Sequence, residues 1–268
     1  MMKLQRALCY AFLIIVSILS VFPLYWMLIS SSNLSVEVLS GKLTPGTHIA
    51  ENWATLISQQ DVFNAMKNSF VNAVTLTLAS LAICSLAGYG FEIYHDRHKD
   101  RLMGVLLLAM MVPFIATLIP LFQMFSSMYL LNSTLGFILP TISTPFLIMM
   151  FRQSARSFPH DIIDAARIDG LNEFQIFCRM FIPTMRSTYA AAMTITFMNA
   201  WNSYLWPKVI MLTDKGTTMP MLIANLIAGY VTDYGALMLA VLICTIPTVI
   251  IFFLLQKSFT NGVVGSVK

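Results

Sequence analysis

Long apolar stretches alternate with shorter polar segments along the whole chain. Six of them have about the 20 residues that a helix needs to cross a hydrocarbon layer about 30 Å thick. Helices are expected because lipid cannot hydrogen-bond to backbone groups, whereas a helix satisfies its own. The six ranges are Ala7–Ile29, Ser69–Phe91, Leu102–Met124, Leu135–Phe151, Ser187–Pro207 and Tyr234–Leu255. The pattern predicts an all-α membrane protein with six transmembrane helices.

Two of these stretches have unusual features. The first follows Lys3 and Arg6 as a secretory signal would, but it is too long for one and no cleavage pattern follows, so we expect an uncleaved helix. The fourth contains Pro140 and Pro145 and is expected to be irregular.

Composition supports a chain that lies almost entirely in the membrane. Hydrophobic residues make up 57% of the 268 positions and charged residues 10%, against about 25% charged in a soluble domain. Six spans occupy roughly 120 positions, which leaves loops and tails but no separate catalytic domain. We therefore expect a single domain over residues 1–268. The four cysteines are far apart and are expected to be packing residues.

The basic residues indicate the orientation of the spans. If the N-terminus is cytoplasmic, segments 92–101, 152–186 and 256–268 are cytoplasmic too, and so is the C-terminus. Twelve Lys and Arg residues then lie inside: Lys3, Arg6, Arg97, Lys99, Arg101, Arg152, Arg156, Arg167, Arg179, Arg186, Lys257 and Lys268. Four lie outside: Lys42, Lys67, Lys208 and Lys215. Loops rich in Lys and Arg stay in the cytoplasm, so this orientation is favoured. The scattered charges do not form the basic stripe of a nucleic-acid-binding protein.

Charge is almost absent from the spans themselves. Proton-coupled pumps and ion exchangers place ionisable residues within the bilayer to carry ions. The sequence also lacks an evident internal repeat, which many secondary transporters have. The driving force is therefore expected to enter from outside the spans.

The loop over about 152–186 is the most informative segment. Pro159 suits a helix start, Asp161 and Asp164 suit its first turns, and Gly170 suits its end. Its apolar side is expected to consist of Ile162, Ala165, Ala166 and Ile168. A second short helix is expected over 172–181, ended by Pro183. From the pattern alone, the first helix could equally lie on the lipid surface, with its arginines near anionic headgroups.

The same loop resembles a known motif. Asp164-Ala165-Ala166, then Gly170, then Met180-Phe181-Ile182-Pro183 is similar to the EAA loop of ATP-binding-cassette (ABC) importer permeases. That pattern is Glu-Ala-Ala, three residues, Gly, nine residues and Ile-x-Leu-Pro. The spacing matches throughout, whereas Asp164, Met180 and Ile182 replace Glu, Ile and Leu. The shorter Asp164 side chain requires a closer approach to any charged partner.

This resemblance implies a coupling helix that docks on a separate cytoplasmic ATPase. Small side chains at Ala165 and Ala166 permit close approach, Asp164, Arg167 and Asp169 are suited to charge-assisted contacts, and Gly170 turns the chain. Pro183 completes the motif. Closure of the ATPases would move the helix and switch the spans between inward- and outward-facing states, as in a type I ABC importer.

Further segments resemble the carbohydrate-uptake branch of these permeases, in particular the second, shorter subunit of maltose-type and glycerol-3-phosphate-type importers. They are Phe22–Trp26, Asn68–Phe70, Val112-Pro113 and Ala200–Pro207. The resemblance implies a second permease subunit, two ATPase subunits that hold ATP and Mg, and an extracytoplasmic solute-binding protein. The expected location is the bacterial cytoplasmic (inner) membrane, in which the chain would pass the bilayer several times. No phosphate-binding loop occurs, so no cofactor is expected in this chain.

The fifth apolar stretch has side chains suited to a sugar. On a continuous helix Asn199, Asn202 and Trp206 would share one side and Trp201 the other. Amides bind hydroxyls and indole stacks on an apolar ring face, so Asn199, Asn202, Trp201 and Tyr204 are candidates for the substrate path. The amides could instead join helices, and Trp206 is expected to be an interfacial anchor.

Three polar segments of the sequence remain to be interpreted. The run from His95 to Arg101 is expected to be a solvated anchor rather than a metal or phosphate site, and no metal site is expected elsewhere. The loop 209–233 would face the binding protein by resemblance. The tail 256–268 is too polar to span and lies near the ATPase in maltose-type relatives.

The sequence thus predicts a non-catalytic permease subunit of an ATP-driven, binding-protein-dependent sugar importer that works by alternating access. The alternatives are a secondary sugar carrier, disfavoured by the EAA-like loop, and an intramembrane lipid-modifying enzyme. Such an enzyme would need paired carboxylates, a His-Glu-x-x-His helix or a Ser/His pair at membrane depth.

Overall fold

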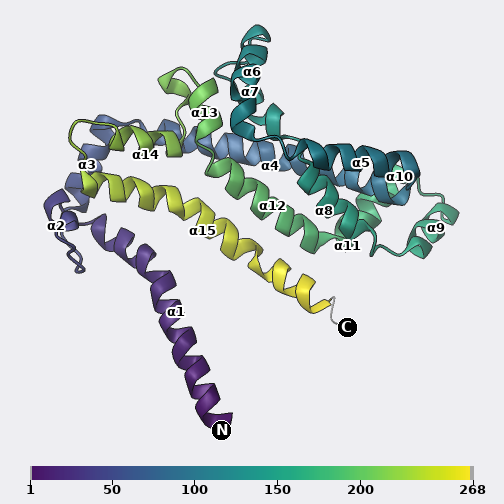
Figure 1. Cartoon of the computed structure of the whole chain (residues 1–268), viewed down its shortest axis with the longest axis horizontal. Coiled ribbons are helices and arrows are strands. Elements are labelled where there is room, and N and C mark those ends of the chain that lie inside the picture. Colours follow the sequence, from purple (N-terminus) through teal and green to yellow (C-terminus); the bar gives the residue numbers. More distant parts are fainter. Residues whose placement is uncertain (1, 266–268) are drawn as a thin grey trace. The chain divides into compact units, whose positions relative to one another are not determined.

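The chain is helical in the computed structural model, which describes the backbone of residues 2–265 and the side chains of residues 5–256 (Figure 1). No β-strand occurs in that range, so the all-α prediction is confirmed. The α-helices are α1 (Met2–Ser30), α2 (Ser35–Leu39), α3 (Ile49–Gln59), α4 (Val62–Ile93), α5 (Arg97–Ala109), α6 (Phe114–Ser127), α7 (Thr134–Ile138), α8 (Pro145–Ala155), α9 (His160–Ile168), α10 (Glu173–Ile176), α11 (Ile182–Thr184), α12 (Arg186–Trp201), α13 (Leu205–Ile210), α14 (Met219–Ile227) and α15 (Tyr234–Gly265). Two 3₁₀ turns, η1 (Leu139–Thr141) and η3 (Asp214–Gly216), and one π turn, η2 (Phe177–Phe181), complete the set.

Three of the expected spans are continuous helices. Long apolar segments lie in α1, α4 and α15, where Gln5–Ser30, Val62–Ile93 and Tyr234–Gln256 are long and apolar enough to cross a membrane. Two pairs of helices pass the same criteria but are bent, so the described residues hold up to five spans by length and composition.

The third expected span, Leu102–Met124, is one of the bent pairs and is not one continuous helix. Its two helices, α5 and α6, meet at an angle of 97°. Pro113 stands directly before α6 in an extended conformation, with φ −61° and ψ 129°. Proline lacks an N–H group and disfavours helical geometry in the residue before it, here Val112, so a break at this point is expected.

The fourth expected span is irregular, as its prolines predicted. The segment Thr134–Thr141 meets α8 at an angle of 55°. Pro145 occupies the first turn of α8, where its missing N–H leaves no helical hydrogen bond unmade.

The fifth expected span is also interrupted, and the assumption of one helix over 187–207 was wrong. After Trp201, where α12 ends, the Asn202 side chain donates to Met198 O at 2.9 Å. A continued helix would bring the Pro207 ring against the carbonyl of Ser203. The chain instead restarts as α13 at Leu205.

The contacts of the described chain divide into two compact units. The first comprises residues 2–63 together with Met221–Pro247. Asp233 caps α15, because its Oδ1 accepts from Gly235 N at 3.0 Å. The same oxygen also accepts from Ser35 Oγ at 2.8 Å, which connects α2 with the start of α15. A Cβ at Gly235 would lie 2.5 Å from Asn52 Oδ1, so this close approach requires glycine.

The second unit comprises Asn64–Pro220 and residues 248–265. Its core includes Cys84 of α4, Phe151 of α8 and Ala192 of α12, all fully buried. A Cβ at Gly88 would lie 2.5 Å from Phe151 Cβ, so α4 and α8 approach closely at that point. Buried Cys84 has the expected packing role, whereas Cys9 is exposed within this chain.

Candidate functional site

The helix predicted in the long loop is present as α9, and it ends at glycine as expected. Gly170 has φ +80°, the left-handed conformation that glycine adopts without strain. The N–H of Gly170 donates to Arg167 O and that of Leu171 to Ala166 O, both at 3.0 Å. These two bonds form a Schellman motif, which terminates the helix and reverses the chain.

The second half of the loop begins with a capping box. Asn172 Oδ1 accepts from Gln175 N at 2.9 Å, and Gln175 Oε1 accepts from Asn172 N at 3.0 Å. The helix then widens into the π turn η2, in which Ile182 N donates to Phe177 O. Pro183 does not end this segment as predicted, because the helical chain continues through Thr184. The break falls two residues later, at Met185, whose φ is −90° and ψ 20°.

One face of α9 is fixed to the helices around it. Ile163 and Ala166 are buried in a cluster with aromatic residues of α4, η2 and the segment before α9. Within it the Tyr89 ring lies 4.9 Å from that of Phe181, and Phe158 lies 5.6 Å from Phe181, measured between centroids. Such packing makes α9 move with the helices that it contacts.

The opposite face of α9 is exposed, and it is not the face that the sequence suggested. Ile168 is 87% exposed, and Ile162 and Ala165 are also exposed, so of the four residues expected on the buried side only Ala166 is there. Buried Ile163 was missed. Figure 1 shows α9 at the edge of the second unit.

The charged residues of the motif lie on the exposed side of the loop. Asp164 has a side chain that is 68% exposed and Arg167 one that is 42% exposed, and Asp169 is exposed as well. Arg167 Nε lies 2.9 Å from Glu173 Oε1, and its Nη1 lies 3.4 Å from Asp164 Oδ1. The guanidinium therefore joins α9 to α10 across the Gly170 turn.

Tyr94, just after α4, completes this charged group. The hydrogen bond from Arg167, followed by that from Tyr94, lowers the pKa of the Glu173 carboxyl. Burial, together with the Glu173 carboxylate, raises the pKa of the Tyr94 hydroxyl. Both shifts arise where the turn meets the end of α4.

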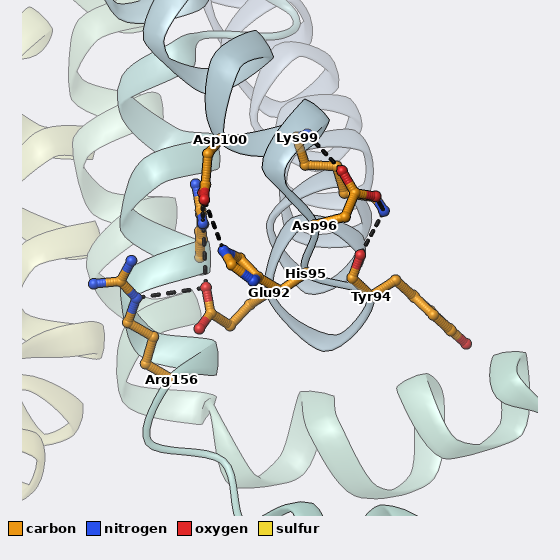
Figure 2. A network of polar contacts seen from close by, with 8 residues as sticks. Glu92, Tyr94, His95, Asp96, Lys99, Asp100 and Arg156 are labelled. Atoms are coloured by element: carbon orange, nitrogen blue, oxygen red, sulfur yellow. Dashed lines mark hydrogen bonds and ion pairs between the residues drawn. The ribbon is translucent and has the colours of Figure 1, made fainter.

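Behind the loop, a network of ion pairs joins α4, α5 and α8 (Figure 2). Arg152 is 4% exposed, and its guanidinium contacts Glu92 Oε2 at 3.1 Å and Asp100 Oδ1 at 2.5 Å. Arg156 Nε lies 3.4 Å from Glu92 Oε2, and His95 Nε2 lies 2.9 Å from Asp100 Oδ2. A buried arginine with two carboxylate partners fixes the spacing of three helices at this end of the unit.

The run from His95 to Arg101 is therefore more than a solvated anchor. Asp96 caps α5, because its Oδ1 accepts from Lys99 N at 2.8 Å and its Oδ2 pairs with the Lys99 ammonium. The hydrogen bond from the Lys99 side chain lowers the pKa of Asp96 to about 2. Over the described residues, no three His, Cys, Asp or Glu side chains are grouped as metal ligands would be.

A cavity of about 210 Å³ lies within the second unit. The side chains around it come from α4, α6, α7, α8, α12 and α13 and from η1. Its polar lining consists of Thr141, Thr144, Thr196, Asn199 and Ser203. Four aromatic residues also line it: Phe114, Phe137, Phe146 and Trp206. This combination of hydroxyl, amide and aromatic groups suits a small hydroxylated molecule.

The predicted substrate-path residues occupy different positions around this cavity. Asn199 lines it. Asn202 is exposed but bonds back to its own helix, Trp201 is 1% exposed and stacks on Phe197, and Tyr204 is 41% exposed. The break after Trp201 explains the difference, since the expected helical positions assumed a continuous helix.

Trp206 is buried rather than exposed as an interfacial anchor. It is 3% exposed, its Nε1 donates to Gly136 O at 3.1 Å, and its ring packs at right angles to that of Phe125. Thr196 was missed, although it lies three residues before Asn199 on α12, a spacing that helical periodicity could have suggested. Ser203 was missed too, and it lies beyond the break after Trp201, where helical periodicity no longer applies.

Comparisons with known proteins agree with this architecture. A family model described as "Binding-protein-dependent transport system inner membrane component" matches residues 85–264. The lactose transport system permease protein LacG of Rhizobium radiobacter is 40% identical over 266 residues, which cover 99% of this chain and 97% of that protein. The arabinooligosaccharides transport system permease protein AraQ of Bacillus subtilis (strain 168) is 32% identical over 263 residues, 96% of this chain and 94% of that one.

A more distant relative and a solved structure extend the comparison. The sn-glycerol-3-phosphate transport system permease protein UgpE of Escherichia coli (strain K12) is 28% identical, covering 92% of each chain. The crystal structure of a bacterial ABC transporter involved in the import of the acidic polysaccharide alginate contains a chain with 18% identity. The TM-score is 0.85, with coverage of 96% of this chain and 97% of that one, so the two share their fold.

Proposed function

Because the chain belongs to the family of binding-protein-dependent transport system inner membrane components, we propose that it couples an ATPase to solute import through α9. It has the fold of a type I ABC importer membrane domain. It is a non-catalytic permease subunit of a sugar importer, since its relatives are permease proteins and ATP is hydrolysed by another subunit. The predicted function is therefore confirmed at this level.

The observation that carries the coupling proposal is the two-sided character of α9. Ile163 and Ala166 fix the helix to the aromatic cluster, while Asp164, Ala165 and Ile168 are exposed. An exposed small residue between a charged and an apolar one suits a groove on a partner subunit. Arg167 and Asp169 extend this docking surface toward Gly170, and Pro183 lies in the segment that returns the chain to α12. A displacement of α9 by the ATPase would be transmitted through the buried face.

The proposal requires α9 to lie in the cytoplasm, with six spans and both termini on that side. We assign five crossings to the three continuous helices and the two bent pairs, each pair counted as one span, and the sixth to α12, which has 16 residues. The excess of Lys and Arg in the segments 92–101 and 152–186 supports this orientation. Lys268 lies outside the described residues, as do the side chains of Lys3 and Lys257 and of the tail from residue 257 onward.

We propose that the complete transporter contains a second permease subunit, two ATPase subunits and an extracytoplasmic solute-binding protein. ATP and Mg would bind to the ATPases, and this chain would hold no cofactor. The whole chain would act as one membrane domain in the bacterial cytoplasmic membrane. Family membership and the related permeases support this assembly.

The solute is proposed to be a di- or oligosaccharide. Lactose is the first candidate, since LacG shares 40% identity along nearly the whole chain, and arabinooligosaccharides are the second. Glycerol 3-phosphate is a more distant candidate, from 28% identity with UgpE.

The test is ATP-dependent uptake by the reconstituted transporter. Proteoliposomes with all subunits, the binding protein and radiolabelled lactose or arabinotriose should accumulate sugar only with a competent ATPase. Asp164→Lys should abolish uptake and leave membrane insertion unchanged. The control is Glu51→Lys, another exposed carboxylate, with a 68% exposed side chain but outside the loop. Uptake by this chain without any ATPase, or normal uptake by Asp164→Lys, would contradict the proposal.

A further inference from the structure

The lining of the cavity in the second unit carries no ionisable side chain: none of its residues is Asp, Glu, Lys, Arg or His. Its polar groups are the hydroxyls and amide of Thr141, Thr144, Thr196, Asn199 and Ser203. Such groups donate and accept hydrogen bonds in the manner of sugar hydroxyls. They offer no positive charge to a phosphate or a carboxylate.

One of these groups is buried without a partner. Thr196 is 6% exposed, and no described residue forms a hydrogen bond with its Oγ1. Thr194, on the same helix, is 7% exposed, but its Oγ1 donates to Ala190 O at 2.9 Å. A buried hydroxyl without a partner is costly, and few occur in native proteins. The other described side chains of this kind do not line the cavity.

The cavity also has a limited size. Its volume of about 210 Å³ is far above the ~10–15 Å³ that a cavity needs to hold one water. It lies below the range of about 300 to 1,000 Å³ that is typical of pockets for drug-sized ligands. One pyranose or furanose ring is of the appropriate size, whereas a whole oligosaccharide is not. Phe114 and Trp206 present aromatic surface suited to the apolar face of such a ring.

We propose that this cavity binds one neutral sugar ring of the transported solute, with Thr196, Asn199 and Ser203 as its hydrogen-bonding groups. The proposal rests on the function proposed above and adds that this subunit itself selects the solute. A uronic acid or sugar phosphate is disfavoured, because its charge would be transferred from water to a lining without an opposite charge. The site therefore favours neutral saccharides over charged ones.

The first experiment measures protection of a cysteine in the cavity. Thr144→Cys, at a lining position that is not one of the three proposed hydrogen-bonding groups, is introduced after the four natural cysteines are replaced, and the assembled transporter in nanodiscs is alkylated with N-ethylmaleimide. Galactose and galacturonate form a matched pair, since they share a ring and differ in the charge at the sixth carbon. Galactose should slow alkylation in a saturable manner, whereas galacturonate at the same concentration should not. Ser58→Cys, exposed and outside the cavity, should react at the same rate with either sugar.

The second experiment tests the unpartnered hydroxyl. Thr196→Val keeps the shape of the side chain and removes the hydroxyl, so the galactose concentration for half-maximal protection should rise about three- to tenfold. Thr196→Ser keeps the hydroxyl and should stay close to the parent. Thr194→Val is the matched control and should change protection less than twofold, because its hydroxyl bonds its own helix.

The outcomes separate this proposal from the function on which it rests. Equal protection by both sugars would overturn the neutral-sugar assignment, and equal half-maximal concentrations for Thr196→Val and the parent would overturn the role of Thr196. If neither sugar protects while ATP-dependent lactose uptake is normal, the polar groups serve only helix packing and the site is refuted, although the transport function stands. Protection without ATP-dependent uptake of any sugar would refute the transport function instead.

Discussion

Arg167 Nε lies 2.9 Å from Glu173 Oε1, so that one ion pair connects α9 with α10 across the turn at Gly170. Both side chains are more than 40% exposed, at 42% and 45%. Exposed pairs add little to stability, so the pair is expected to orient α9 rather than to hold the fold together.

The first prediction concerns exchange of these two charges. Arg167→Glu should reduce ATP-dependent uptake, because it repels Glu173 and Asp164 and releases the turn. The double variant Arg167→Glu, Glu173→Arg restores the pair and should recover most of the uptake. The melting temperature of each purified variant should stay within about 2 °C of the parent. If the double variant stays inactive, Arg167 acts on the ATPase itself and not through Glu173.

The second prediction concerns Gly170. Its φ is +80°, and among the described residues no neighbouring atom would lie within 4 Å of an added Cβ, so any cost of substitution comes from the backbone and not from a clash. Gly170→Val should destabilise the loop by about 1–2 kcal/mol. Gly170→Asn should cost less, because Asn tolerates the left-handed region. Limited proteolysis of the loop and coupled ATP hydrolysis would measure the effect.

Gly90 provides the matched control for this series. The described part of the chain also places nothing within 4 Å of a Cβ added to Gly90, but this residue lies inside α4 with an ordinary helical φ. Gly90→Ala should leave loop cleavage and coupling unchanged. Equal effects of Gly90→Ala and Gly170→Val would show that conformation at residue 170 is not the cause.

The sequence predicted the parts of the molecule that depend on local pattern. A helix start at Pro159 and an end at Gly170 follow from proline and glycine preferences, and α9 has both. The buried face of α9 could not be predicted from such preferences, because Ile162 and Ile163 are both apolar and sequence alone did not identify which one contacts the aromatic cluster. That choice depends on Phe158 and Phe181, whose positions are set by tertiary packing.

Other features have no local signal at all. The Arg152 ion pairs join residues 52 and 60 positions apart, so no local pattern around Asp100 predicts them. The cavity depends on breaks that long apolar windows conceal, since a span interrupted after Trp201 has the same average hydropathy as a straight one. Asn199 was identified because it lies before the break, where helical periodicity still holds.

The third prediction concerns Arg152, whose side chain is 5% exposed. Arg152→Met should destabilise the protein by about 3 kcal/mol, because it leaves the Glu92 carboxylate largely buried with a weaker partner. Arg152→Lys keeps the charge but cannot make the same pair of contacts, so its stability should lie between those of the parent and Arg152→Met. Thermal unfolding of the purified transporter measures the order.

Glu92→Gln in the Arg152→Met background separates charge from packing. If the unpaired carboxylate is the cause, neutralising Glu92 should recover part of the lost stability. A further loss in the double variant would contradict this explanation and point to packing of the arginine chain.

The last prediction is the pH dependence of the Asp96 cap. Its pKa falls from 3.8 to about 2, chiefly through the hydrogen bond from the Lys99 side chain. A carboxyl whose pKa is lowered in the folded state stabilises that state fully above the unfolded pKa, and this stabilisation disappears as the pH falls through the folded pKa. Asp96→Asn keeps a capping oxygen and loses the charge. The melting temperature of the parent should therefore exceed that of Asp96→Asn by a constant margin from about pH 8 to pH 5. This margin should shrink below about pH 4. In a Lys99→Met background the margin should be smaller at every pH. A margin that widens on acidification would show that the Asp96 charge does not stabilise α5 in the folded protein.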